Sequence, residues 1–224
     1  MLSDMRRGAL VSAWLGGVLA GRLALDTALS HLSPVAGVGW PDLLTDGRAI
    51  GAHGVRLFLP RPGDPRGQRS PDPAAATAGA VLGWIGPEGI AAWTTITDEA
   101  PWSVRPAPPV TTTLPTPADA DRDLRAAILR AADDLATLDQ HVESSGMRTG
   151  IARELTAWSD APLDPARAAL AARAVPLLLA SVCAPEAGVT AHAQRARHAT
   201  LMALDPVVRT CVEVAYSCPD ATAP

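Results

Sequence analysis

The stretch that decides the fold, residues 54–67, reads GVRLFLPRPGDPRG. Its first part, Val55 to Pro60, has the apolar and β-branched composition that is typical of a strand. Its second part, Arg61 to Gly67, is built largely from proline, glycine and aspartate, which favour tight turns. The stretch therefore predicts a rigid strand that presents a specified loop, and this loop is the first place to look for a site.

A small, mostly antiparallel sheet is predicted around this strand. Residues 78–85 and 90–97 are rich in apolar, β-branched and tryptophan side chains, and the GPEG sequence between them favours a turn. These two segments therefore indicate a hairpin. Trp102 to Arg105 is expected to add an edge strand, which Pro106 ends.

Helices are expected before the first strand. The segment 4–20 has a helical apolar pattern and ends near Gly21, a residue type that commonly terminates helices. A second helix is predicted over 26–32, and Pro34 is expected to stop it. A third helix is predicted over 40–49. These helices and the sheet together make an N-terminal α+β half.

The C-terminal half is predicted to be a helical bundle. Residues at alternating spacings of four and three lay one apolar stripe along its first helix: Leu124, Ile128, Ala131, Leu135, Leu138 and Val142. Further helices are expected over 151–158, 164–183 and 190–216, with Pro176 and Pro206 kinking or dividing the last two. The predicted fold class is α+β, with N-terminal helices and a small sheet followed by a bundle.

Composition indicates a modular chain. The segment PAPPVTTTLPTP, residues 106–117, separates a glycine- and tryptophan-bearing half from one rich in alanine, arginine, aspartate and leucine. The expected divisions are an α+β half over 1–110 with a Pro/Gly-rich loop over 60–73, a linker over 111–117, a helical half over 118–218 and a tail over 219–224.

Length and charge limit the function classes. A chain of 224 residues can bury about 70% of its unfolded surface, so it can build a real core. All 19 basic residues are arginine, as in chains from high-GC genomes, which excludes a lysine Schiff base and a Walker-type phosphate lysine. The net charge is −4 and the arginines are scattered, so nucleic acid is not an expected partner.

Cysteine usage favours a cytoplasmic protein. Cys183, Cys211 and Cys218 have no CxxC spacing, which is typical of reduced thiols, with a Cys211–Cys218 disulfide as the alternative. The N-terminus imitates a secretory signal, but Arg22 interrupts the apolar run and no convincing cleavage site follows. We expect a retained helix and no membrane span, because a span needs about 20 continuous apolar residues.

The loop offers one candidate ligand site. Asp64 lies between Arg61 and Arg66, where its carboxylate could act as an acid or a ligand and the guanidinium groups could hold an anion. The alternative is turn chemistry alone, with Asp64 capping its own loop and Gly63 at a positive φ.

Trp84 and Trp93 of the expected hairpin could line an apolar or sugar-like pocket, or serve as core. The motifs GxSxG and GxGxxG are absent, and no two histidines fall at the spacing that places both on one helix face. The sequence therefore predicts no catalytic residue, no metal and no cofactor.

Three stretches carry a resemblance: WLGGVLAGRLALDTAL (14–29), GVRLFLPRPGDPRG (54–67) and DLRAAILRAADDL (123–135). Together they resemble a group of uncharacterised proteins from high-GC actinobacteria. The resemblance implies no activity, cofactor or catalytic residue.

The predicted function is that of a cytoplasmic, non-catalytic scaffold or small-ligand-binding module. It would work through helix-mediated protein contacts, with a protein partner or a second copy of the chain on the C-terminal helices. The alternative is an enzyme that acts on a small anionic substrate at the Arg61, Asp64 and Arg66 loop. A membrane surface is not an expected partner, although Met5 and the arginines after it would provide a contact.

Overall fold

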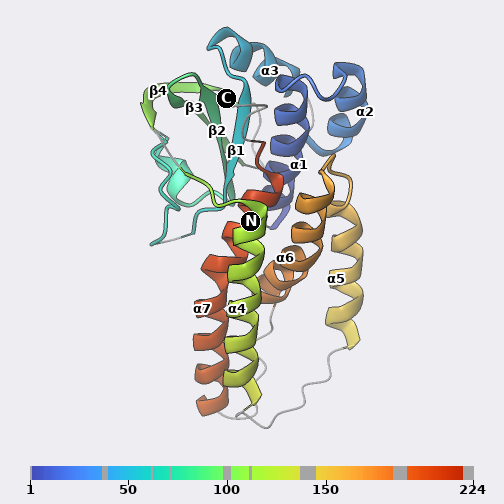
Figure 1. Ribbon diagram of the computed structural model, residues 1–224, viewed down its shortest axis with the longest axis vertical. Helices are drawn as coiled ribbons and strands as arrows, with labels where there is room; N and C mark the ends of the chain where they lie inside the picture. The colour runs from blue at the N-terminus through green and yellow to red at the C-terminus, as the bar shows by residue number, and fades with distance from the viewer. Residues whose placement is uncertain are drawn as a thin grey trace. The chain divides into compact units, whose positions relative to one another are not determined.

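The computed structural model describes residues 2–36, 40–61, 63–70, 72–97, 102–110, 113–136, 145–183 and 191–218. Its contacts divide the chain into two compact units (Figure 1). Unit 1 comprises residues 1–114, 160–163 and 216–224, and unit 2 comprises 115–159 and 164–215.

Unit 1 holds the sheet and the N-terminal helices. Its elements are α1 (Leu2–Leu19), α2 (Leu25–Ala36), α3 (Trp40–Ala49), β1 (Gly54–Phe58), the short 3₁₀ helix η1 (Pro73–Ala76), β2 (Ala80–Gly86), β3 (Gly89–Ile96) and β4 (Arg105–Val110). Unit 2 is formed by α4 (Pro117–Ala136), α5 (Ser145–Trp158), α6 (Pro165–Cys183) and α7 (Ala191–Tyr216). The predicted α+β fold class is confirmed.

The sheet has four antiparallel strands in the order β1-β2-β3-β4 (Figure 1). The predicted hairpin is present as β2 and β3, in which Gly86 pairs with Gly89 across the turn. Gly89 has a φ of +118°, which a side chain would disfavour. Between the turn and the middle of the hairpin the register shifts at Trp84 and Ile85, and beyond this shift Gly83 lies opposite Trp93.

The edge strand differs from the prediction. A strand over 102–105 that ends at Pro106 was expected, whereas β4 begins at Arg105 and runs through Pro106, Pro108 and Pro109 to Val110. Prolines are tolerated there because β4 pairs with β3 alone, and an edge strand does not need every backbone N–H for the ladder. The start of the proline-rich segment, residues 106–110, therefore belongs to the sheet.

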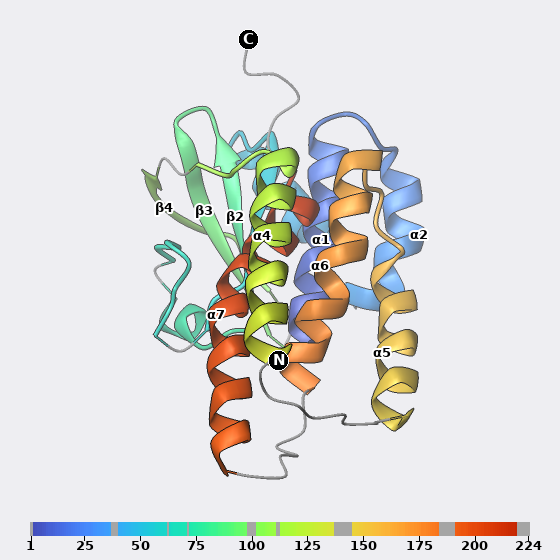
Figure 2. The ribbon, with the colours of Figure 1, turned by 60° about the horizontal axis from the view of Figure 1, so that its bottom comes forward.

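One face of the sheet is covered by α1 of the same unit (Figure 2). α1 packs against β1 and β2 so closely that a Cβ atom added at Gly8 would overlap the Ala80 side chain. α3 approaches the same face, where a Cβ atom at Gly47 would overlap the ring of Trp84. Glycine at these two helix positions is therefore required by the close approach, not by backbone conformation.

The other face is covered by the loop that follows β1. Apolar residues of the strands and of this loop form one buried cluster there: Phe58, Ala75, Ala78, Val81, Ile90 and Trp93. The Arg56 guanidinium lies 4.6 Å from the centre of the Phe58 ring on this side. The loop is thus a structural layer of unit 1.

Three prolines lie inside helices and do not divide them. Pro34 was predicted to stop the second helix, but it lies inside α2. Pro176 and Pro206 likewise lie inside the single helices α6 and α7. A proline removes one helical hydrogen bond, and packing of the surrounding turns can offset that loss.

Ion pairs and caps organise unit 2. Thr116 caps α4 by accepting a hydrogen bond from the Asp119 backbone N–H at 3.1 Å. Asp121 on α4 lies 2.8 Å from Arg125, as its spacing predicts, and 2.6 Å from Arg173 on α6. The second contact joins the two helices.

α6 is the one helix of the described residues that is long and apolar enough to cross a membrane, over Pro165–Val182, and 33% of that stretch is buried. Its buried residues recur at helical spacing and form one stripe: Leu170, Ala171, Ala174, Val175, Leu178 and Leu179. This pattern is typical of a helix that packs in a bundle, and length and composition alone are weak evidence for a span.

The C-terminal segment returns to the sheet, and its residues 216–218 belong to unit 1. Cys218 exchanges two backbone hydrogen bonds with Val55 of β1, at 2.8 and 3.2 Å, and the Ser217 hydroxyl accepts one from Leu57 N–H at 2.9 Å. Cys211 and Cys218 do not form a disulfide with each other, so that alternative is wrong. The predicted tail, 219–224, lies outside the described residues.

Tyr216 gives a prediction for alkaline conditions. It is the single tyrosine and is 2% exposed, and burial raises the pKa of its phenol far above the usual value of 10. Because the phenol ionises more easily in the unfolded chain, the free energy of unfolding should fall as pH rises above about 10. Tyrosinate absorbance should appear only together with the loss of helical circular dichroism. Ionisation near pH 10 in the folded protein would contradict this.

Candidate ligand site at the 61–67 loop

A two-residue turn opens the loop. β1 ends at Phe58, and the next two residues are buried, so the chain leaves the sheet in a fixed direction. The backbone N–H of Arg61 donates to the Asp64 carbonyl at 3.0 Å, and that of Asp64 donates to the Arg61 carbonyl at 2.9 Å. Gly63 has the expected positive φ, +82°. Arg61 and Asp64 are thus the two ends of one tight turn.

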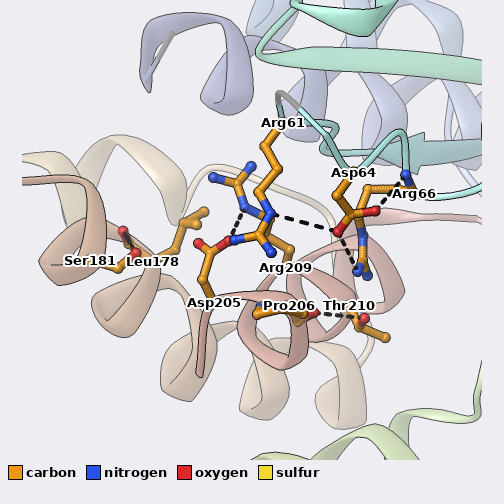
Figure 3. Close-up of polar contacts among 9 residues, drawn as sticks. All are labelled: Arg61, Asp64, Arg66, Leu178, Ser181, Asp205, Pro206, Arg209 and Thr210. Carbon is orange, nitrogen blue, oxygen red and sulfur yellow. Dashed lines mark hydrogen bonds and ion pairs between the residues drawn. The ribbon is translucent and has the colours of Figure 1, made fainter. Parts of the chain in front are cut away.

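The Asp64 carboxylate brings the predicted residues together (Figure 3). Its Oδ2 atom lies 3.7 Å from Arg61 Nε and 3.7 Å from Arg66 Nη1. Its Oδ1 atom accepts a hydrogen bond from the Arg66 backbone N–H at 3.0 Å. Both features expected from the sequence, flanking guanidinium groups and a cap on its own loop, are therefore present.

A second turn places Arg66. Its φ of +56° is unusual for a residue with a side chain, and Gly67 follows with a φ of +71°. The Gln68 backbone N–H closes this turn on the Pro65 carbonyl at 3.0 Å. A non-glycine residue in this region costs about 1–2 kcal/mol, which the contacts of Asp64 with Arg66 help to offset.

Side chains of the loop also supply acceptors for its backbone further on. Backbone N–H groups donate to Gln68 Oε1 at 2.8 Å, to Ser70 Oγ at 3.2 Å and to Asp72 Oδ1 at 3.0 Å, each from two residues ahead. Such local bonds order a loop that has little regular structure. The sequence signal for these three bonds, an acceptor side chain at 68, 70 and 72, was missed.

Asp72 ties the loop to the sheet edge. Burial raises the pKa of this carboxyl, but the Thr95 hydroxyl, the Ala74 backbone N–H and the charge of Arg105 outweigh it, so the pKa lies below 3.8. The Arg105 guanidinium on β4 is 3.8 Å from Asp72 Oδ2. This contact, between residues far apart in sequence, was also missed.

The two tryptophans do not share a site. Trp84 is fully buried against α3, and its indole N–H donates to Thr94 Oγ1 at 2.9 Å. Trp93 is 1% exposed on the opposite face, where its ring lies 5.3 Å from that of Phe58. Trp84 pairs with Ala92, and Trp93 is the next residue on β3. Because successive strand residues point to opposite faces of the sheet, the two tryptophans lie on opposite faces.

The loop has limited means for chemistry. Both Asp64 oxygens contact groups of the same loop, which suits the maintenance of its shape. The trio carries one net positive charge, which suits an anionic ligand. In the part of the chain that the structure describes, no three His, Cys, Asp or Glu side chains gather to hold a metal.

Replacement of Asp64 tests its structural role. Asp64→Ala should lower the free energy of unfolding by about 1 kcal/mol, because the Arg66 N–H loses its acceptor and both guanidinium groups lose a counter-charge. Asp64→Asn should cost less, since its amide oxygen can still accept that bond. Urea unfolding measures both, and equal stability of wild type and Asp64→Ala would contradict the role.

Searches of curated proteins and of solved structures found no match to the chain. A family model does match, and it covers the first two of the three stretches that carry the actinobacterial resemblance, whereas 123–135 lies outside it. Its last residue falls close to the Leu114–Pro115 division between the units. Residues 8–116 match the family described as Rv1486c-like protein, N-terminal domain, which is named after a mycobacterial protein, so this part of the chain is similar to an actinobacterial group.

Proposed function

We propose that this protein is a non-catalytic cytoplasmic interaction module that binds protein through the C-terminal half of α4, with a second copy of the chain as the partner. The observation that carries the proposal is the exposure of leucine on this helix. Leu129, which is not part of the predicted stripe, is 68% exposed. Leu135 of that stripe is 38% exposed, whereas Leu124, with which the stripe begins, is fully buried.

Leu129 belongs to an exposed apolar face, and Leu135 lies at its border with the buried side. At 100° per residue, Leu129, Ala132 and Ala136 fall within about 60° of one another on α4, and half-buried Ile128 and Leu135 lie between them and the buried residues. The buried side is formed by Ala120, Leu124, Ala127 and Ala131. Part of the apolar surface of α4 is therefore not buried by other residues that the structure describes. The rest of the predicted stripe, Leu138 and Val142, lies outside them.

A second copy suits this face. The residues of this face between 128 and 136 are uncharged and Asp133 lies at its border, so two copies can meet there with little like-charge repulsion despite the net charge of −4. Two-fold pairing would place the same apolar patch on both sides, as in most homodimers. The cytoplasmic part of the proposal is supported by Cys211 and Cys218, which form no disulfide.

Leu135→Asp tests the proposal. Sedimentation velocity should show a concentration-dependent dimer for the wild type, which Leu135→Asp weakens at least tenfold, because burial of a leucine contributes about 1.5–3 kcal/mol. Leu25→Asp is the matched control, since Leu25 on α2 is also 38% exposed. A wild-type monomer at the highest soluble concentration would contradict the proposal, as would equal weakening by both variants.

A second candidate function is binding of a small anion at Arg61, Asp64 and Arg66. It is favoured by the two guanidinium groups that converge on one carboxylate. Inorganic phosphate should then give a saturable calorimetric titration that Arg66→Gln abolishes. The absence of saturable binding would remove this candidate and leave the first one intact.

A further inference from the structure

Three side chains join α1, α2 and the connection between α5 and α6. The Trp14 indole N–H donates to the backbone carbonyl of Asp160 at 2.9 Å. The His31 ring stacks on Trp14 with ring centres 4.4 Å apart and planes inclined by 18°. His31 Nδ1 lies 3.1 and 3.0 Å from the two carboxylate oxygens of Asp160. We call these residues the clasp.

The clasp attaches the connection to unit 1. Residues 160–163 belong to that unit, although the helices on either side of them, α5 and α6, belong to unit 2. Trp14 is 6% exposed, so packing holds its ring in one position beneath the His31 ring. The side chains of His31 and Asp160 are 40% and 54% exposed, so the imidazole can exchange protons with the solvent.

Protonation of His31 strengthens two of the contacts. In one neutral tautomer, Nδ1–H already donates to the Asp160 carboxylate. A second proton, on Nε2, converts this hydrogen bond into an ion pair. It also places a cation over the face of the Trp14 ring, which a cation–π attraction favours.

The charges around His31 are few. Among the described residues, the ionisable side chain that contacts the His31 ring is Asp160. From α1, the ring is contacted by the uncharged indole of Trp14. On α2, the residues one turn away, Thr27 and Val35, do not titrate. The remaining charges on α2 and on α3, which packs on it, are Asp26, Asp42, Asp46 and Arg48.

From this arrangement we infer that the clasp is a pH-sensitive device that holds the α5–α6 connection on unit 1 more firmly as the solution is acidified. The contribution of the ion pair is present when His31 is protonated and is lost as pH rises and the imidazole becomes neutral. Histidine makes this change between about pH 8 and pH 5. The device does not involve the α4 face.

Hydrogen exchange of the full chain tests the clasp. Mass spectrometry at about pH 5.5 and pH 7.5, corrected for intrinsic exchange rates, should show the 159–163 backbone about two- to fivefold more protected at the lower pH. His31→Gln and Asp160→Asn should each abolish this difference. His198→Gln, on α7, is the control and should retain it.

Two results would overturn the inference. The first is equal protection of residues 159–163 at both pH values in the wild type. The second is a pH difference that survives in Asp160→Asn, because it would then come from another group. If Asp160→Asn unfolds the connection, His31→Gln decides instead, because it removes the imidazole and leaves the bond from Trp14 to the Asp160 backbone carbonyl in place. A pH difference in protection that survives in His31→Gln would reject the ion pair.

Discussion

Replacement of Arg209 by methionine is expected to lower the free energy of unfolding by about 3–5 kcal/mol. Arg209 Nε donates to Asp205 Oδ2 at 2.8 Å within α7 (Figure 3), and the two side chains are only 5% and 9% exposed. Methionine keeps the apolar length of the side chain but removes the charge. The Asp205 carboxylate then stays buried without this partner, which is the main source of the loss.

The exposed pair of Arg122 and Asp119 is the matched control. It has the same 2.8 Å separation, but its side chains are 71% and 46% exposed, so Arg122→Met should cost less than about 1 kcal/mol. The double variant Asp205→Leu with Arg209→Met should recover much of the lost stability, because it removes both buried charges. Urea unfolding measures all three. Equal losses for Arg209→Met and Arg122→Met would contradict the burial of the α7 pair.

Gly47→Ala should have the second large effect on stability. The sign of the change in the free energy of unfolding tells whether α3 packs on Trp84. On an unobstructed helix, alanine in place of glycine stabilises by about 1 kcal/mol. Here the added Cβ would overlap the Trp84 ring, which is fully buried and held by its bond to Thr94. We therefore expect a net destabilisation of about 1–3 kcal/mol, since overpacking forces α3 or the ring to move.

A double-mutant cycle isolates this contact. Trp84→Phe removes part of the ring and loses stability by itself, but Gly47→Ala should be much less harmful in that background. Thermal or urea unfolding of the four proteins gives the coupling. If Gly47→Ala stabilises the wild-type protein, α3 does not pack on Trp84 as described.

Local patterns predict much of the fold. The GPEG turn between two β-rich segments specified the hairpin, and apolar periodicity with capping residues specified the helices. The failures have a shared cause, because they depend on neighbours in space. The prolines of β4 are acceptable only at an edge, and the return of Ser217 and Cys218 to β1 has no local signal.

The contacts of the candidate site residues and of the clasp were also predictable only where the residues lie close together in the sequence. The grouping of Arg61, Asp64 and Arg66 follows from turn chemistry and was predictable, because all three lie within one short segment. The separation of Trp84 from Trp93 was available from strand alternation once the hairpin register is known. The clasp was not predictable, because Trp14 and Asp160 are 146 residues apart in the sequence.

The central claim, that the protein associates through the C-terminal half of α4, is tested most directly by hydrogen exchange of the wild type at low and high protein concentration. We predict that exchange across residues 128–136 slows as concentration rises, while α2 around the equally exposed Leu25 is unchanged. Exchange across 128–136 that does not depend on concentration would contradict the claim.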